Sequence, residues 1–191
     1  MARNVEFNEK EAIQKAMEVF WKKGYSGASL RDLTDAMKIN SSSLYNTIGD
    51  KRELFVKCIK NYTETRTDAM VKRAANTKSP LEVIVNFIND AVAVIINGDS
   101  CMAIKTAFEI ADDDKSIQEI LKDDNDFVQH FLITHITKAI QQGEIANEEE
   151  PELLADYFLS TWTGWYESYL LHKDPVKINR MAQYFIKQLT K

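Results

Sequence analysis

The sequence contains little glycine and proline, with six Gly and three Pro among 191 residues. An all-β fold needs turn residues about every ten positions, so this scarcity argues against strands and favours helices. Long apolar runs are absent too, because the longest, Ala91–Ile96, is far below the roughly 20 residues that span a bilayer. We therefore predict an all-α protein without a membrane span. Residues 1–10 lack the apolar core of a signal peptide, so we expect a cytoplasmic location.

Cysteine is scarce as well, and the chain has no net positive charge. Cys58 and Cys101 are the only cysteines, and their wide separation predicts two buried thiols in a reducing compartment rather than a disulfide. The net charge is -5, although nucleic-acid-binding proteins usually carry a basic surface. The charge is uneven, since residues 1–60 hold 11 Lys and Arg against 8 Asp and Glu, and residues 61–191 hold 13 against 21. The first part is thus +3 and the remainder -8. Chance variation among solvated faces explains this asymmetry equally well.

No residue pattern of a common catalytic or metal site occurs. The sequence contains no Glu-x-x-His, His-Glu-x-x-His or Gly-x-Ser-x-Gly motif. His130 and His135 are five residues apart, which places them about 140° apart around a helix and not on one face. Cys101 has Lys105 as its only basic neighbour and is expected to be a small buried hydrophobe. We therefore expect no enzyme activity, no cofactor and no metal.

Capping residues, glycines and apolar spacing place the predicted helix boundaries. Capping pairs stand at Asn8-x-x-Glu11, Ser29-x-x-Asp32 and Asp50-x-x-Glu53, and Ser79-Pro80 is a further helix start. The predicted helices are 8–24, 29–37, 40–48, 50–75, 79–98, 101–111, 116–142, 150–172 and 175–189. No segment alternates in the manner of a strand.

The first three predicted helices occupy about fifty residues, and the second and third are short and joined by a tight turn. This is the layout of a helix-turn-helix, although any small three-helix bundle also shows it. We predict a helix-turn-helix domain at residues 1–50 and a larger helical domain for ligand binding and dimerisation at 51–191, connected by the helix 51–75. A helical adaptor that binds another protein through its head is the alternative.

Specific residues in this region match a known pattern. Ser29 opens the second helix, Leu44-Tyr45 lie in the third, and Asp50-Lys51 begin the fourth. With the upstream residues Ala16, Phe20 and Gly24-Tyr25, and with Leu54, residues 7–60 resemble the DNA-binding domain of the tetracycline-repressor (TetR) family. The segment from Cys101 to Glu109 resembles, more weakly, a Cys-Leu-x-x-Asn-x-x-x-Glu stretch that occurs in one branch of that family. Lys105 stands here in place of the Asn.

Two positions depart from the family pattern. Lys38 stands in the turn where Gly is most frequent, so a positive φ there costs about 1 kcal/mol. Ile48 replaces an aromatic after the recognition helix, which keeps the site apolar. The resemblance still implies a dimeric regulator, expected to be a repressor, that binds a palindromic operator in double-stranded DNA and is released by an apolar or amphipathic small molecule.

Small polar side chains at the start of the third helix suit the floor of a DNA groove. Base discrimination is expected from Ser42, Ser43 and Asn46, since Asn can pair with adenine. Tyr45 and the helix starts at Ser29 and Lys51 are expected to hold phosphates. The predicted DNA-binding set is Ser29, Asn40, Ser41, Ser42, Ser43, Tyr45, Asn46 and Lys51. The alternatives are solvated caps for the serines and a half-buried core aromatic for Tyr45.

The last two predicted helices carry more apolar surface than one helix pair can bury, which favours a homodimer. The predicted interface residues are Leu154, Phe158, Trp165, Met181, Phe185 and Leu189. The middle helices hold further aromatics that usually form a core. The family resemblance implies that some of them line an effector pocket, and the predicted set is Phe87, Met102, Thr106, Phe108 and Trp162.

Overall fold

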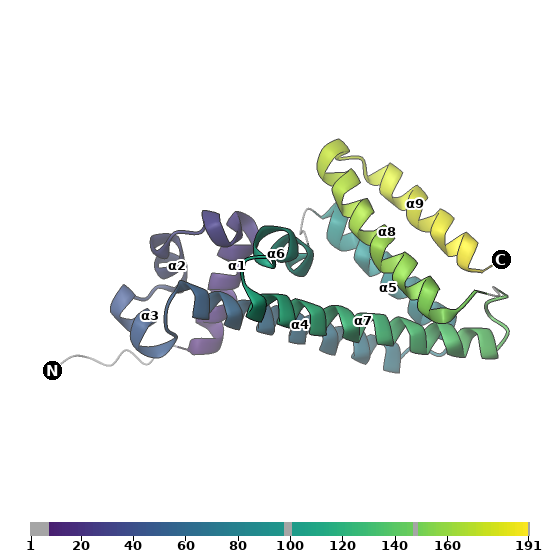
Figure 1. Ribbon diagram of the computed structural model, residues 1–191, viewed down its shortest axis with the longest axis horizontal. Helices are drawn as coiled ribbons and strands as arrows, with labels where there is room; N and C mark the ends of the chain where they lie inside the picture. Colours follow the sequence, from purple (N-terminus) through teal and green to yellow (C-terminus); the bar gives the residue numbers. More distant parts are fainter. Residues whose placement is uncertain (1–7, 98–100, 147–148, 191) are drawn as a thin grey trace. The chain divides into compact units, whose positions relative to one another are not determined.

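The computed structural model describes residues 8–97, 101–146 and 149–190, and in these residues it contains helices and no strand (Figure 1). This confirms the predicted all-α class. The helices are α1 (Glu9–Gly27), α2 (Leu30–Met37), α3 (Ser41–Thr47), α4 (Lys51–Ala75), α5 (Pro80–Ile96), α6 (Met102–Ile110), α7 (Lys115–Gln141), α8 (Pro151–His172) and α9 (Pro175–Leu189). Residues 1–7 and the helix end predicted at Gly98 lie outside the described residues.

The predicted N-cap residues lie at the starts of the helices, where their side chains accept hydrogen bonds from backbone N–H groups of the first turn. The Asn8 side chain accepts from the Lys10 and Glu11 N–H groups at 3.1 and 3.3 Å. Ser29 and Asp32 form a reciprocal capping box, and so do Asp50 and Glu53, whose two bonds are both 2.8 Å long. These bonds satisfy N–H groups that the first turn of a helix leaves unpaired.

The chain divides into two compact units. The first, which we call the head, contains the described residues up to Arg66 together with Met102–Leu121. The second contains Thr67–Cys101 and Lys122–Lys191. This division differs from the predicted one at residue 50, because α6 packs against α1 and the first two-thirds of α4 belong with the head. Parts of α4 and of α7 therefore belong to each unit.

The core of the first unit is built around the aromatic rings of α1 and α4. The rings of Phe20 and Phe55 meet edge to face at 4.8 Å between centroids, and both side chains are buried. Leu33 from α2 and Leu44 from α3 are fully buried in the same unit. Burial of Leu44 matters most for the short α3, because an isolated helix of seven residues is unstable in water.

The turn between α2 and α3 has the geometry predicted for it. Lys38 adopts φ 56° and ψ 38°, in the left-handed region. Its N–H donates to Asp35 O at 3.3 Å, and the Ile39 N–H donates to Thr34 O at 3.1 Å. This pair of bonds is a Schellman motif, which ends α2 and reverses the chain towards α3.

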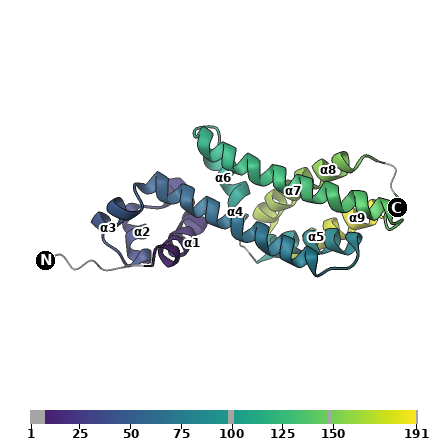
Figure 2. The same ribbon diagram turned by 90° about the horizontal axis from the view of Figure 1, so that it is seen from below.

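The second unit packs α5 against α8 and α9. Its centre is an aromatic cluster in which Phe158 meets Phe87, Trp165 and Phe185 at centroid distances of 5.7, 6.0 and 5.3 Å. The Tyr169 hydroxyl donates to Ile96 O at 2.9 Å and ties the end of α5 to α8. Figure 2 shows α5, α8 and α9 grouped together in a second view.

Both cysteines are buried, as predicted. Burial raises the pKa of the Cys58 thiol far above its usual range, so the thiol stays protonated at neutral pH. Within the described ranges, no helix combines the length and apolar character that a membrane crossing requires.

We predict that Lys38→Gly stabilises the first unit. Glycine removes the roughly 1 kcal/mol strain of a left-handed lysine, and part of this gain is offset by the greater freedom of the unfolded chain, so we expect about 0.5 kcal/mol. Urea unfolding of the full chain measures it. The matched change Lys60→Gly in the middle of α4 should instead cost about 1 kcal/mol. Equal destabilisation by both changes would show that Lys38 is not strained.

Candidate nucleic-acid interface

One face of α3 is buried and the opposite face is exposed. Leu44 points into the core, whereas Ser41, Ser42 and Asn46 are exposed and Tyr45 keeps 52% of its surface accessible. For Ser42, Tyr45 and Asn46 this follows from the helical repeat, because positions one and two residues away from a buried residue point outwards. Ser41, three residues before Leu44, is exposed as the first residue of α3. The structure therefore gathers these four predicted DNA-binding residues on one exposed face. Tyr45 is not a core aromatic.

The remaining predicted contacts have partners within the protein. Asn40 caps α3, since its Oδ1 accepts from the Ser43 N–H at 2.7 Å, and Ser43 is half-buried. The Ser29 hydroxyl donates to Asp32 Oδ2 at 2.7 Å. The Lys51 ammonium lies 4.6 Å from the centroid of the Tyr25 ring, a cation–π contact that holds it at the start of α4.

Arg31 was not among the predicted DNA-binding residues. Its side chain is 91% exposed at the start of α2, and its ion pair with Asp35 is long at 3.7 Å. A guanidinium in this state is available to a phosphate. The signal that could have identified Arg31 is its position two residues after the N-cap Ser29.

Two other cations of the head, Lys23 and Arg52, are held in ion pairs within the protein. Lys23 donates to Asp32 at 2.6 Å and, with Ser29, holds the pKa of the Asp32 carboxyl well below its usual range. Arg52 donates to both Asp114 oxygens, at 2.5 and 2.8 Å, and holds the pKa of the Asp114 carboxyl low in the same way. This fork joins the start of α4 to the residue before α7.

The α6 helix is fastened to a kink in α1. Gly24 interrupts α1 with φ 76° and ψ 174°, and the backbone N–H groups of Tyr25 and Ser26 both donate to the Glu109 carboxylate at 2.9 Å. A Cβ at Gly24 would lie 2.8 Å from Glu109 Oε2, so a side chain there would displace the carboxylate. Lys105 adds a bond from its ammonium to Trp21 O at 2.8 Å. We call this set of contacts the α1–α6 clasp.

The environment of Glu109 favours its ionised form. Burial alone raises the pKa of the carboxyl, but the Ser26 and Tyr25 N–H groups and the charge of Lys105 outweigh burial and lower the pKa below its usual value. The clasp is therefore fully formed at neutral pH.

The predicted effector-pocket residues are divided between the two units. Phe87 and Trp162 belong to the second unit, with ring centroids 6.0 Å apart. Met102, Thr106 and Phe108 lie on α6 in the first unit, where Phe108 is 78% exposed. The Trp162 indole N–H is buried and has no hydrogen-bond partner among the described residues. Phe87 and Trp162 are thus the part of the predicted set that meets within one unit.

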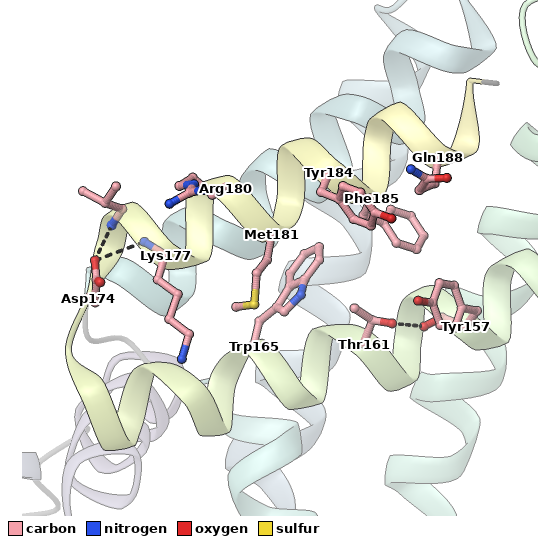
Figure 3. Close-up of a pocket in the computed structure, with 11 residues that line it drawn as sticks. Tyr157, Thr161, Trp165, Asp174, Lys177, Arg180, Met181, Tyr184, Phe185 and Gln188 are labelled. Carbon is pink, nitrogen blue, oxygen red and sulfur yellow. Dashed lines mark hydrogen bonds between the residues drawn. The ribbon is translucent and has the colours of Figure 1, made fainter.

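The predicted dimer residues lie mostly inside the protomer. Leu154, Phe158, Trp165, Phe185 and Leu189 are each at most 8% exposed. Met181 is half-buried and faces Trp165 across a groove of about 640 Å³ between α8 and α9 (Figure 3). The exposed apolar residues of these helices are Leu153, Tyr157, Leu170, Leu171, Val176 and Tyr184. Amphipathic spacing identified the apolar stripes but could not tell which stripe the protomer covers itself.

The head contains a helix-turn-helix whose second helix, α3, lies on its surface, and the second unit is helical too. This arrangement defines the chain as a helix-turn-helix transcriptional regulator. Residues 12–58 match the family described as bacterial regulatory proteins, tetR family, and residues 80–185 match the tetracyclin repressor-like C-terminal domain. The chain belongs to the TetR family.

Individual relatives agree with this assignment. The chain is 30% identical over 152 residues to the uncharacterised regulator YezE of Bacillus subtilis, covering 78% of each chain. It is 26% identical to the repressor DhaR of a Mycobacterium species, covering 80% of this chain and 77% of the relative. A cysteine mutant of the TetR family regulator CifR, solved with operator DNA, shares the fold with a TM-score of 0.83 at 22% identity, covering 97% of this chain and 98% of CifR.

We predict that Glu109→Gln weakens the α1–α6 clasp. The loss should be about 1 kcal/mol, at the low end for charged hydrogen bonds because the carboxylate keeps contact with solvent. At pH 7 the Tyr25 and Ser26 amides should exchange their hydrogens several-fold faster. Because the lowered pKa makes the wild-type clasp strongest above the ordinary carboxyl range, the difference should vanish as pH falls through the Glu109 pKa. Glu119→Gln, at an exposed position on α7, is the control. Unchanged exchange in Glu109→Gln would contradict the clasp.

Proposed function

We propose that this protein is an operator-binding repressor that acts as a homodimer and releases DNA when a small molecule binds its second unit. The observation that carries the proposal is the exposed row Ser41, Ser42, Tyr45 and Asn46 above the buried Leu44. Membership of the TetR family supports it, and so do two similar proteins, the repressor DhaR and the regulator CifR, which was solved in complex with operator DNA.

The chemistry of α3 favours modest discrimination at each base. The helix contains no Lys or Arg, so the strong bidentate contact to guanine is missing from it. Asn46 can pair with adenine, and Ser42 offers a short donor and acceptor that approaches a base edge closely. Affinity then comes from phosphate contacts by Tyr45, Lys51 and Arg31, which position the head without reading sequence.

We predict that Tyr45→Ala combined with Lys51→Ala weakens binding to all duplexes alike. A palindromic operator is first recovered by selection from random duplexes, and binding of the full chain is then measured over a range of salt concentrations. The slope of log affinity against log salt should fall by about one phosphate contact, because Lys51 is charged and the Tyr45 hydroxyl is not, while the preference for the operator survives.

The matched variant Lys115→Ala removes an exposed cation of the same unit from the start of α7 and should leave the slope unchanged. Asn46→Ala should reduce preference at one base position by about 1–3 kcal/mol without changing the slope. An unchanged slope in the double variant would remove Lys51 from the DNA contact, and an unchanged affinity would remove Tyr45 as well. A selection that recovers no sequence would remove the operator-binding function itself.

For the homodimer, we propose that a second copy covers the exposed α8–α9 face around the groove. Tyr157 and Tyr184, which are 59% and 65% exposed, supply amphipathic aromatic surface of the kind that protein interfaces favour. The rim of the groove carries Lys177 and Arg180 beside Asp174. A two-fold contact brings the same face of both copies together, so groups of opposite charge are available on each side.

We predict that Tyr184→Glu gives folded monomers. The new carboxylate is solvated in the free protomer but loses its hydration in a dimer interface, which disfavours association. Sedimentation at micromolar concentration measures the oligomeric state. Phe185→Glu, one residue further along α9, should instead unfold the second unit because Phe185 is 7% exposed. Phe127→Glu on α7 is the exposed control. A wild-type monomer would exclude the proposed face.

For ligand control, we propose the Phe87–Trp162 cluster as part of the effector site. The unpaired indole N–H of Trp162 supports this, because a buried donor without a partner is costly and a ligand acceptor would satisfy it. A hundredfold loss of operator affinity requires only about 2.7 kcal/mol of difference in ligand binding between two states. The α4 helix, which contributes residues to both units, is the proposed route of coupling.

A further inference from the structure

A second cavity lies in the second unit, where the end of α4, the start of α5 and the later part of α7 meet. Its volume is about 490 Å³, within the range of small-molecule sites. Val71, Val83 and Phe131 form an apolar wall, and Lys78, His135 and Lys138 supply the charged and titratable groups. None of these residues belongs to the predicted effector set.

The groups lining this cavity are cationic or neutral. No carboxylate lines it, although residues 61–191 carry a net charge of -8. Lys78 and Lys138 form no salt bridge with any described residue. The neighbouring Glu144 is already engaged, because its carboxylate accepts from the Ser79 hydroxyl at 2.9 Å and from the Leu81 N–H at 2.8 Å. Two exposed lysines thus line this cavity without an ion pair among the described residues.

His135 contributes a hydrogen-bonding group that the described residues do not satisfy. Its Nδ1 is shielded from solvent and has no hydrogen-bond partner among them. Burial and the charge of Lys138 lower the pKa of the imidazole, which is therefore neutral at pH 7 and can present Nδ1 as a donor. The ring itself lines the cavity and offers a neutral hydrogen-bonding side chain beside the two lysines.

The apolar wall extends towards the aromatic cluster. The Phe131 ring lies 4.5 Å from the His135 ring and 6.1 Å from the Phe87 ring, measured between centroids. An occupant with a hydrocarbon tail could therefore cover Val71, Val83 and Phe131 while its polar end stays near the two lysines. The N-terminus of α5, which could otherwise favour a phosphate, is capped by Ser79 and Glu144.

We propose that this cavity binds a small carboxylate with an apolar tail, its carboxylate held by Lys78, Lys138 and His135 and its tail packed on Val71, Val83 and Phe131. We infer a carboxylate, with its single charge, because the cavity offers two lysines but neither the bidentate guanidinium of an arginine nor a free helix N-terminus. The inference rests on the proposed ligand control only for the consequence of binding, since the binding itself requires no DNA.

Calorimetry of the full chain with decanoate, below the concentration at which it aggregates, tests the site. We expect saturable binding at one site per chain, and decanol, which has the same tail without the charge, should bind at least tenfold more weakly. The double variant Lys78→Met with Lys138→Met should lose at least tenfold in decanoate affinity. The control pair Lys72→Met with Lys187→Met removes two exposed cations of the same unit and should change it less than twofold.

Two further variants separate the head group from the tail. His135→Phe should weaken decanoate several-fold and leave decanol unchanged, whereas Ala74→Trp, which fills the cavity, should weaken both. Equal binding of decanoate and decanol, full affinity in the Lys78 and Lys138 variant, or no binding at all would overturn the proposal.

If decanoate also releases DNA, operator duplex must weaken decanoate binding by the same factor. A chain that binds operator but not decanoate contradicts this site alone, and one that binds decanoate but no duplex contradicts the repressor function alone.

Discussion

Two backbone N–H groups at the kink in α1 donate hydrogen bonds to the Glu109 carboxylate, and these bonds decide which helices make up the head. They join residues up to 84 positions apart and make α6 part of the same compact unit as the helix-turn-helix. The contact requires Gly24, since the backbone conformation is left-handed and a Cβ would occupy the space of the carboxylate. Lys105 adds an ammonium at the end of the first helical stretch of α1, where carbonyl groups carry partial negative charge.

The α3 helix shows why the head must be ordered as a whole. Seven residues cannot maintain a helix in water, so its stability comes from Leu44 in the core, from the Asn40 cap and from the Schellman turn at Lys38. These contacts fix one face of α3 against α2. The opposite face is left to carry Ser42, Tyr45 and Asn46, so the residues proposed to read DNA contribute little to folding.

Two buried ring nitrogens of the second unit have no hydrogen-bond partner among the described residues. They are the Trp162 indole N–H and His135 Nδ1, and both are shielded from solvent. Buried polar groups are seldom left unpaired unless something else binds them. Phe87 and Phe131 lie between these two atoms and connect them through ring contacts. A unit of this kind is suited to ligands, and the head is suited to a fixed geometry.

Local features were readable from the sequence alone. Helix starts at Asn8, Ser29 and Asp50 follow from interactions within a few residues, which the chain order determines directly. The family resemblance of residues 7–60 rests on the same local pattern.

Only the tertiary structure decided which distant residues share an environment. It assigned α6, with Phe108, to the first unit through Glu109, and buried Trp165 and Phe185 inside the protomer while leaving Tyr184 exposed. It also brought Lys78, His135 and Lys138 into one cavity. Helical spacing shows that a face is apolar or charged, but the partner that covers that face is chosen by packing between helices far apart in the chain.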